Sequence, residues 1–284
     1  MKRIRILAAG IISLLAASFA SAQTMVVIVQ VPMGAPKVAG VGKVLTIDAT
    51  STAQRVPVVL ADYVNTPNQR WTLQTAGGGK YFIYNTADGR AIEATTTDEN
   101  APLYAADLNW EDAQQMWRFA PAWGIADRKI TSAFNGLCLT HGYLKPDEYA
   151  PVSQSSRDVV ATGWLVVPVH SVPNFGTFAT SLGSYNSDPN WKNLGFRLKR
   201  VRNVLRVGFW IWTDSGGPEA AVWEDAKCYA PWDEWQHFFL VDTGTRETYH
   251  ADAYALGADN EWHYFSSTSQ VVGQPVQPER PANP

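Results

Sequence analysis

The amino-acid sequence predicts an all-β protein in two parts, and three observations support that prediction. A Gln-x-Trp tripeptide ends at Trp71 and again at Trp117, and a degenerate third copy ends at Trp164, so the spacings are 46 and 47 residues. Self-similarity at a fixed period is typical of a repeated structural unit. No segment shows a sustained apolar period of 3.6 residues, whereas residues 205–213 alternate with the period of a strand.

The three repeats occupy residues 40–170, and each has an apolar run with a proline 13 to 15 residues before its Trp. A single unit of strands and turns cannot close a core, so we expect three units to close one together, with pseudo-threefold symmetry. The Trp rings would pack inward, and the Gln two positions earlier would fix a loop by hydrogen bonds. The expected strands are 24–31, 43–47, 56–60, 81–85, 101–105, 129–132 and 163–169.

Residues 171–270 differ from the repeats because their expected strands are longer and more aromatic: 205–213, 235–241, 247–255 and 261–266. In the first of these, apolar side chains fall on one face and Trp210 and Trp212 on the other, so the second face is either covered or carries a binding surface. Residues 242–245 predict a hairpin. We expect an antiparallel β-sandwich here, followed by a disordered, proline-rich tail over 271–284.

The chain begins with the pattern of a secretory signal peptide. Residues 1–5 form a basic segment with three Lys or Arg side chains, and residues 6–20 are apolar. Ala20-Ser21-Ala22 fits a cleavage site, which gives a mature start near Gln23. An uncleaved anchor is the alternative. No later segment is long and apolar enough to suggest a membrane span. We therefore expect a secreted or periplasmic protein organised as signal peptide 1–22, repeat domain 23–170, second β domain 171–270 and tail 271–284.

The charge balance argues against a nucleic-acid partner. The full chain has a net charge of −3, and loss of the three basic residues within 1–22 would leave −6. A basic cluster formed by Arg197, Lys199, Arg200, Arg202 and Arg206 is short, and we interpret it as the solvated face of a strand pair rather than a site for nucleic acid or anionic lipid. No cofactor is expected.

The repeated motif resembles the ricin B-type β-trefoil lectins over about residues 40–169. The segments that carry the resemblance are 57–62, 68–71 and the Asn-Gly-Leu-Cys-Leu stretch at 135–139. It implies a β-trefoil with one sugar pocket per repeat. Such a pocket takes an acidic residue after the repeat opening, an aromatic ring, and an Asn before Gln-x-Trp. A carboxylate can accept two hydroxyl donors, and a ring contacts the apolar face of a sugar.

Carried over to this sequence, the resemblance favours the second repeat as the sugar pocket. Glu93 holds the acidic position there, and Gln114 and Gln115 complete the grip. No ring stands at the family's aromatic position, so Tyr104 or Trp110 would have to supply it.

The first repeat is the weaker second site. Thr46 and Ala61 occupy its acidic and aromatic positions, and only Asn68 and Gln69 match. In the third repeat the acidic position is Thr140, and the Asn and Gln are lost. The resemblance implies a metal-free lectin that binds a glycan or glycoprotein. A degenerate trefoil that binds protein, as a toxin or adhesin subunit would, is the alternative.

The chain has two cysteines, Cys138 and Cys228. Cys138 stands at the opening position of the third repeat, where the resemblance implies a disulfide within the repeat, but that repeat lacks a second cysteine. The sequence leaves two arrangements open, namely a Cys138–Cys228 disulfide or two buried thiols.

Other constellations favour a binding protein over an enzyme. Residues 213–218 (Thr-Asp-Ser-Gly-Gly-Pro) resemble a serine-protease segment, but they also form a good turn after a strand. His250 with Asp252, and Glu261 with His263, share strand faces without a recognised metal spacing. Asp233 and Glu234 among tryptophans are the candidate acid pair for the alternative of a glycan-degrading carboxy-terminal domain.

Overall fold

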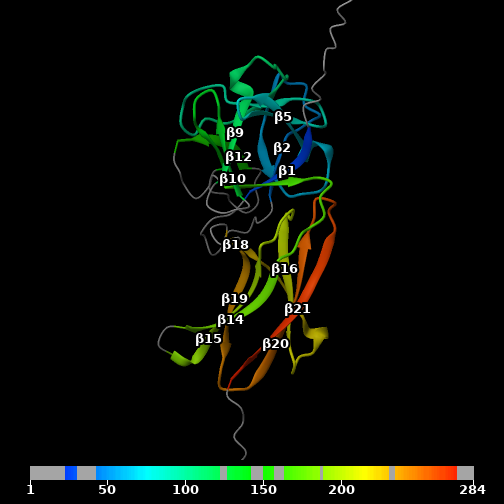
Figure 1. The fold of residues 1–284 in the computed structure, drawn as a ribbon, viewed down its shortest axis with the longest axis vertical. Helices are drawn as coiled ribbons and strands as arrows, with labels where there is room; N and C mark the ends of the chain where they lie inside the picture. Colours follow the sequence, from blue (N-terminus) through cyan, green and yellow to red (C-terminus); the bar gives the residue numbers. More distant parts are fainter. Residues whose placement is uncertain are drawn as a thin grey trace, which may run out of the picture.

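The computed structural model describes residues 23–30, 43–121, 127–141, 150–156, 163–185, 188–229 and 234–273. The described chain is all-β, with a 13-stranded sheet system at one end and two four-stranded sheets at the other (Figure 1). The predicted signal peptide lies outside the described residues, as do residues 274–284 of the predicted tail. Within the described ranges, no helix is long and apolar enough to span a membrane.

Six strands of the amino-terminal part form a closed antiparallel barrel. Each strand pairs with the next in the order β1–β5–β6–β9–β10–β13, and β13 pairs back with β1. The strands are β1 (Thr24–Gln30), β5 (Trp71–Gly77), β6 (Lys80–Asn85), β9 (Met116–Pro121), β10 (Asp127–Ser132) and β13 (Trp164–Pro168).

Three hairpins complete this part, one from each repeat. They are β2 (Val44–Thr46) with β4 (Val59–Ala61), β7 (Ala91–Glu93) with β8 (Tyr104–Ala106), and β11 (Cys138–His141) with β12 (Ala150–Ser155). The short strand β3 (Arg55–Pro57) crosses from the first repeat to β8 of the second. Two barrel strands and one hairpin per repeat, three times over, is a β-trefoil, as predicted.

The recurring tryptophans hold the three repeats in the same way. The indole nitrogen of Trp71 donates to the carbonyl of Leu45, Trp117 donates to Ile92, and Trp164 donates to Leu139, each at 3.0 Å. All three rings are fully buried in one apolar cluster. Burial of about 150–250 Å² per ring contributes about 4–6 kcal/mol each before entropy is counted. The spacing of 46 and 47 residues in the sequence therefore places one Trp of each repeat in the shared core.

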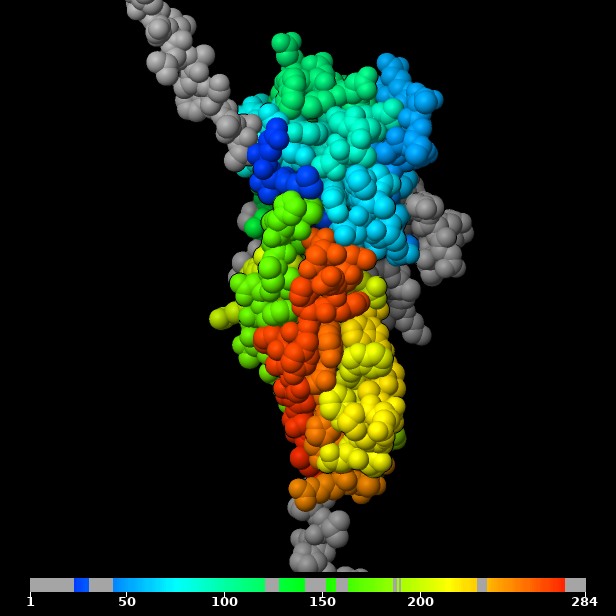
Figure 2. Space-filling model, turned by 90° about the vertical axis from the view of Figure 1, so that its right-hand side faces the viewer, coloured from blue at the N-terminus to red at the C-terminus, as the bar shows by residue number. Residues whose placement is uncertain are grey.

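Strand β1 belongs to two cores at once. Val26 and Ile28 point into the trefoil core, whereas Val27 and Val29 alternate into the apolar cluster of the carboxy-terminal part. The Tyr63 hydroxyl donates to the carbonyl of Ala258 at 2.6 Å across the same boundary. The two parts lie in direct contact, as the packing of cyan against orange-red atoms shows in Figure 2.

The carboxy-terminal part is a sandwich of two antiparallel sheets. One has the order β14–β15–β19–β18, and the other has the order β17–β16–β20–β21. Phe196 from the first sheet and Phe209 from the second are fully buried between them. The strands are β14 (Thr177–Tyr185), β15 (Asp188–Lys199), β16 (Arg206–Thr213), β17 (Val222–Asp225), β18 (Lys227–Tyr229), β19 (Glu234–Asp242), β20 (Glu247–Leu256) and β21 (Trp262–Val272).

The predicted hairpin at residues 242–245 is wrong. β19 pairs with β15 and β18, whereas β20 pairs with β16 and β21, so the turn passes from one sheet to the other. Residues 238–242 of β19 and 251–255 of β20 alternate in burial, and facing sheets satisfy that alternation as well as adjacent strands do. β21 also extends to Val272, beyond the predicted end of the last strand and into the segment that was expected to be a tail.

Candidate functional site

Glu93 lies where the resemblance expects a sugar-binding acid, but protein groups hold its carboxylate. Its side chain is 5% exposed, and Oε1 accepts from Arg55 Nη2 at 2.8 Å. Oε2 accepts from Gln115 Nε2 at 3.3 Å. The equivalent residues Thr46 and Thr140 are buried too. The role of Glu93 as a sugar ligand stays a prediction. In the structure its carboxylate bonds Arg55 and Gln115.

Gln115 and Gln69 make matching loop contacts. Gln115 Nε2 donates to the carbonyl of Asp107 at 2.9 Å, and its Oε1 accepts from the Asn109 amide at 2.8 Å. Gln69 Nε2 donates to the carbonyl of Asp62 at 2.6 Å, and its Oε1 accepts from the amide of Val64 at 2.8 Å. Both glutamines are buried. Each fixes the loop before its Trp, as the sequence predicts for this position.

The aromatic candidates of the second repeat lie on different elements. Tyr104 stands directly opposite Glu93 in the β7–β8 pair, so the two side chains share a face. Trp110 is 49% exposed and packs edge-on against Phe82 and Tyr84 of β6. Gln114 contributes its backbone carbonyl, which accepts from the Ala94 amide. The structure therefore brings Glu93, Tyr104 and Gln115 together.

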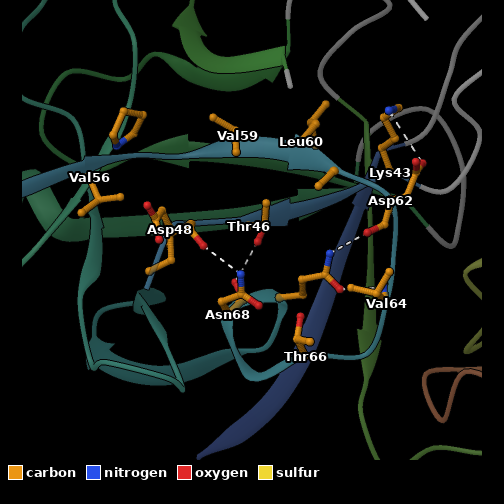
Figure 3. Close-up of a pocket in the computed structure, with 14 residues that line it drawn as sticks. Lys43, Thr46, Asp48, Val56, Val59, Leu60, Asp62, Val64, Thr66 and Asn68 are labelled. Carbon is orange, nitrogen blue, oxygen red and sulfur yellow. Dashed lines mark hydrogen bonds and ion pairs between the residues drawn. The ribbon is translucent and has the colours of Figure 1, made fainter. Parts of the chain in front are cut away.

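A cavity of about 850 Å³ opens over the first repeat (Figure 3). Its apolar surface comes from the β3–β4 segment and its polar surface from β2 and the loop that leads to Trp71. Asn68 and Gln69, the predicted second site, lie on it. The lining residues are Lys43, Thr46, Ile47, Asp48, Val56, Pro57, Val59, Leu60, Ala61, Asp62, Val64, Thr66, Asn68 and Gln69.

The charged groups of this cavity are two carboxylates and one ammonium. The Asp62 side chain is 85% exposed, and its carboxylate lies 3.7 Å from the Lys43 ammonium. Thr66 is exposed, and its side chain does not cap the 3-10 turn that follows it. Asn68 is fixed because its Nδ2 donates to the carbonyl of Ile47 at 2.9 Å. The sequence reasoning missed Asp62 and Thr66, although Asp62 directly follows the expected aromatic position, Ala61.

Asp48 adds a second carboxylate that stays ionised. The Thr50 hydroxyl donates to Asp48 Oδ1 at 2.6 Å and the Thr50 amide donates at 3.0 Å, and these bonds hold the pKa of Asp48 below its usual value. The carboxylates of Asp48 and Asp62 outnumber the single ammonium of Lys43 in this lining, so the polar edge beside the apolar floor suits an uncharged ligand rich in hydroxyl donors.

The other constellations become local structural contacts. Ser215 donates to Glu247 at 2.5 Å, and His250 Nε2 bonds Asp214 at 2.6 Å, so no histidine lies between the serine and the aspartate as a protease requires. His250 pairs with Asp214 rather than with Asp252. His263 Nε2 bonds Asp259 at 2.8 Å rather than Glu261. Across the described ranges, no group of three His, Cys, Asp or Glu side chains could hold a metal ion.

The remaining candidates are Asp233 and Glu234 and the two cysteines. Glu234 is buried on β19, and its Oε1 lies 2.6 Å from the Lys199 ammonium, while Asp233 lies outside the described residues. No disulfide joins Cys138 to Cys228, so the bridge that the sequence left open is not formed. Cys138 is on β11 of the trefoil and Cys228 on β18 of the sandwich, and each thiol is buried in its own part.

Comparison with known proteins yields one family match. Residues 37–104 match a family model described as ricin-type beta-trefoil lectin domain-like. This segment spans the first repeat and the start of the second. The comparison with curated proteins found no match to this chain.

Several solved structures are similar to the chain over about half its length. They include a designed 3-fold symmetric protein (22% identity, TM-score 0.43, 50% of this chain and 97% of that one). A second is a ricin B-like lectin of Macrolepiota procera in complex with lactose (16%, 0.40, 50% and 93%). A third is an exo-beta-1,3-galactanase of Clostridium thermocellum (22%, 0.45, 51% and 30%). The trefoil assignment rests on the strand pairing rather than on these likenesses.

Proposed function

We propose that this chain, whose residues 37–104 carry a ricin-type β-trefoil lectin-like domain, is a secreted protein that binds an uncharged carbohydrate in the cavity of its first repeat. The observation that carries the proposal is the pairing of an apolar floor with the Asp62 and Asp48 carboxylates and the Thr66 hydroxyl on one cavity. A sugar presents an apolar C–H face and several hydroxyl donors, which match these two surfaces.

Export is part of the same proposal and rests on the amino-terminal sequence. The basic start, apolar stretch and Ala-Ser-Ala at 20–22 support cleavage before Gln23 and release to the periplasm or the medium. Mass spectrometry of the mature protein from its producing cell would test this step. An intact Met1 would refute it.

The binding site can be located because the second repeat offers a matched control. Asp62 and Asp107 hold equivalent positions, since each carbonyl accepts from the Gln of its own Gln-x-Trp motif. Both side chains are exposed. A hydrogen bond to a charged group contributes about 1.5–3 kcal/mol, so Asp62→Asn should weaken sugar binding about ten-fold or more. Asp107→Asn should leave it unchanged.

The experiment begins with a glycan array probed with the mature chain, followed by calorimetric titration of the best ligand. Thr66→Ala is a second variant, because its hydroxyl lines the cavity without capping the adjacent turn. If binding instead falls with Asp107→Asn and Glu93→Gln, the site is in the second repeat. An array without any bound glycan would refute the lectin proposal and favour a trefoil that binds protein.

A further inference from the structure

The outer face of the sheet β17–β16–β20–β21 carries a continuous aromatic surface. Inward-facing residues of β16, such as Phe209, fill the core, while the alternate residues point outward. Strand register places rings of neighbouring strands on this same outer face, with Trp210 opposite Trp223 and Tyr254 opposite Tyr264. We call this surface the aromatic platform: Trp210, Trp212, Trp223, Tyr254, Trp262 and Tyr264. Figure 2 shows its strands, yellow through red, on the molecular surface.

Five rings of the platform are linked by ring contacts, and Trp212 stacks on His250 at the end of the same face. Trp223 lies at its centre, with ring centroids 5.3 Å from Trp210, 4.8 Å from Trp262 and 6.1 Å from Tyr254. Trp210 is 41% exposed, Trp262 40% and Tyr264 53%. Rings in this number on a face that does not fill the core indicate a binding surface.

A glycine fixes the central ring in place. A Cβ atom at Gly208 would lie 2.0 Å from Cζ2 of Trp223, so only glycine lets the indole rest against β16. The Trp223 indole nitrogen also donates to Asp225 Oδ1 at 3.3 Å. The platform is therefore ordered before any ligand binds, which lowers the entropic cost of binding.

The polar groups between the rings indicate the chemistry of the ligand. Arg206 is neutralised by Asp225 at 2.7 Å. Asp252 accepts from the Ser267 hydroxyl, which also bonds the Tyr264 hydroxyl at 2.9 Å. Since Arg206 is paired with Asp225, the charge that Asp252 adds between the rings is negative. Polyanions and anionic membranes are disfavoured, while hydroxyl donors find acceptors among the rings.

We propose that the aromatic platform binds an extended, uncharged polysaccharide chain and is separate from the trefoil cavity. Trp212 and Trp262 stand opposite His250 and Leu256, six residues apart on β20, which places them about 20 Å apart at about 3.3 Å per residue. Such a surface is long enough for several sugar rings, and each can lay its apolar face on an indole. This proposal does not depend on sugar binding by the first repeat.

The test is retention of the mature chain on insoluble uncharged polysaccharides, namely microcrystalline cellulose, chitin and β-1,3-glucan. The chain should be retained on at least one of them, and the double variant Trp210→Ala/Trp262→Ala should reduce retention at least ten-fold. Trp191→Ala is the matched control, because Trp191 is 41% exposed on β15 of the opposite sheet. It should bind as the wild type does. Thermal unfolding would verify that each variant is folded.

Several results would overturn the proposal. These are no retention on any of the three polysaccharides, an equal loss with Trp191→Ala, or unchanged binding by the double variant. Sedimentation with phosphatidylserine vesicles that requires Trp210 and Trp262 would make the platform a membrane-binding surface instead. Dimerisation of the wild type that the double variant abolishes would make it a contact between copies. Loss through Asp62→Asn alone would assign polysaccharide binding to the trefoil cavity.

Discussion

Arg55 Nη2 donates to Glu93 Oε1 at 2.8 Å and joins the first repeat of the trefoil to the second. The pair is asymmetric, since the Glu93 side chain is 5% exposed and that of Arg55 is 55% exposed. Arg55 reaches this position because β3 leaves its own repeat and pairs with β8. The contact therefore explains why a carboxylate can be buried at a position where the other two repeats have threonine.

Substitution of Arg55 should destabilise the protein more than substitution of Glu93. Arg55→Ala leaves a buried carboxylate with Gln115 as its remaining side-chain partner among the described residues, which should cost about 3 kcal/mol. Glu93→Gln keeps an acceptor for Arg55 and should cost about 1 kcal/mol. Urea denaturation monitored by Trp fluorescence would measure both free energies of unfolding. Equal losses, or a larger loss for Glu93→Gln, would contradict this account of the pair.

Neighbouring glutamines in the turn before Trp117 should behave differently. Gln115→Ala removes the bonds to the Asn109 amide and the Asp107 carbonyl, which leaves backbone groups unsatisfied and should cost about 2 kcal/mol. Gln114 lies in the same 3-10 turn and contributes only backbone bonds within the described chain. Gln114→Ala should therefore change stability by less than about 0.5 kcal/mol. The midpoint of urea unfolding is the measurement, and similar shifts for both variants would refute a structural role specific to Gln115.

The central ring of the aromatic platform should depend on Gly208. Gly208→Ala places a methyl group against Trp223 and should destabilise the sandwich by about 1–3 kcal/mol, with a change in Trp fluorescence. Gly183→Ala on β14 is the control, because its Cβ would meet nothing closer than the Asn193 carbonyl at 4.0 Å. An unchanged fluorescence spectrum and midpoint for Gly208→Ala would show that Trp223 does not rest on β16 in solution.

The trefoil could be predicted from the sequence because its core repeats at the same period as the chain. Trp71, Trp117 and Trp164 each fill the core and bond a hairpin carbonyl, so the spacing of the Trp residues in the sequence reports the architecture directly. The same holds for the inward face of residues 205–213. The prediction of a hairpin at 242–245 was wrong because a polar turn between two alternating strands does not indicate which sheet each strand joins.

The candidate site was less accessible to sequence reasoning. The position of Glu93 within its repeat identified it as the candidate sugar-binding acid. Arg55, however, lies 38 residues earlier and pairs with Glu93 only because β3 crosses from one repeat to the next. The cavity of the first repeat likewise combines Asp62 and Thr66 from a loop with a floor from β3 and β4. Contacts of this kind depend on tertiary packing, which no motif spacing contains.

His237 should make folding stability fall on the acid side of neutral pH. It lies on β19, its side chain is 18% exposed, and its Nδ1 is 3.8 Å from Glu224 Oε2. Burial lowers the pKa of His237 below its usual 6.5. Lys227 lowers it further, and the Glu224 carboxylate and a backbone bond with Asp225 oppose that shift only in part. The imidazole is therefore neutral in the folded protein at pH values where the unfolded chain already takes up a proton.

The sign of the pH effect follows from that difference. Well above pH 6.5 neither state is protonated at this residue, so its full contribution to stability is present. As the pH falls through 6.5 and on through the lower pKa of the folded state, the unfolded state binds the extra proton and stability decreases. Urea unfolding at pH 7.5 and pH 5.0 would measure the loss, and His237→Gln should flatten it. His170→Gln, at an exposed turn after β13, should retain the full dependence. An identical dependence in the His237→Gln variant would assign the effect to other groups, because removal of the buried imidazole removes the only proton uptake that this prediction invokes.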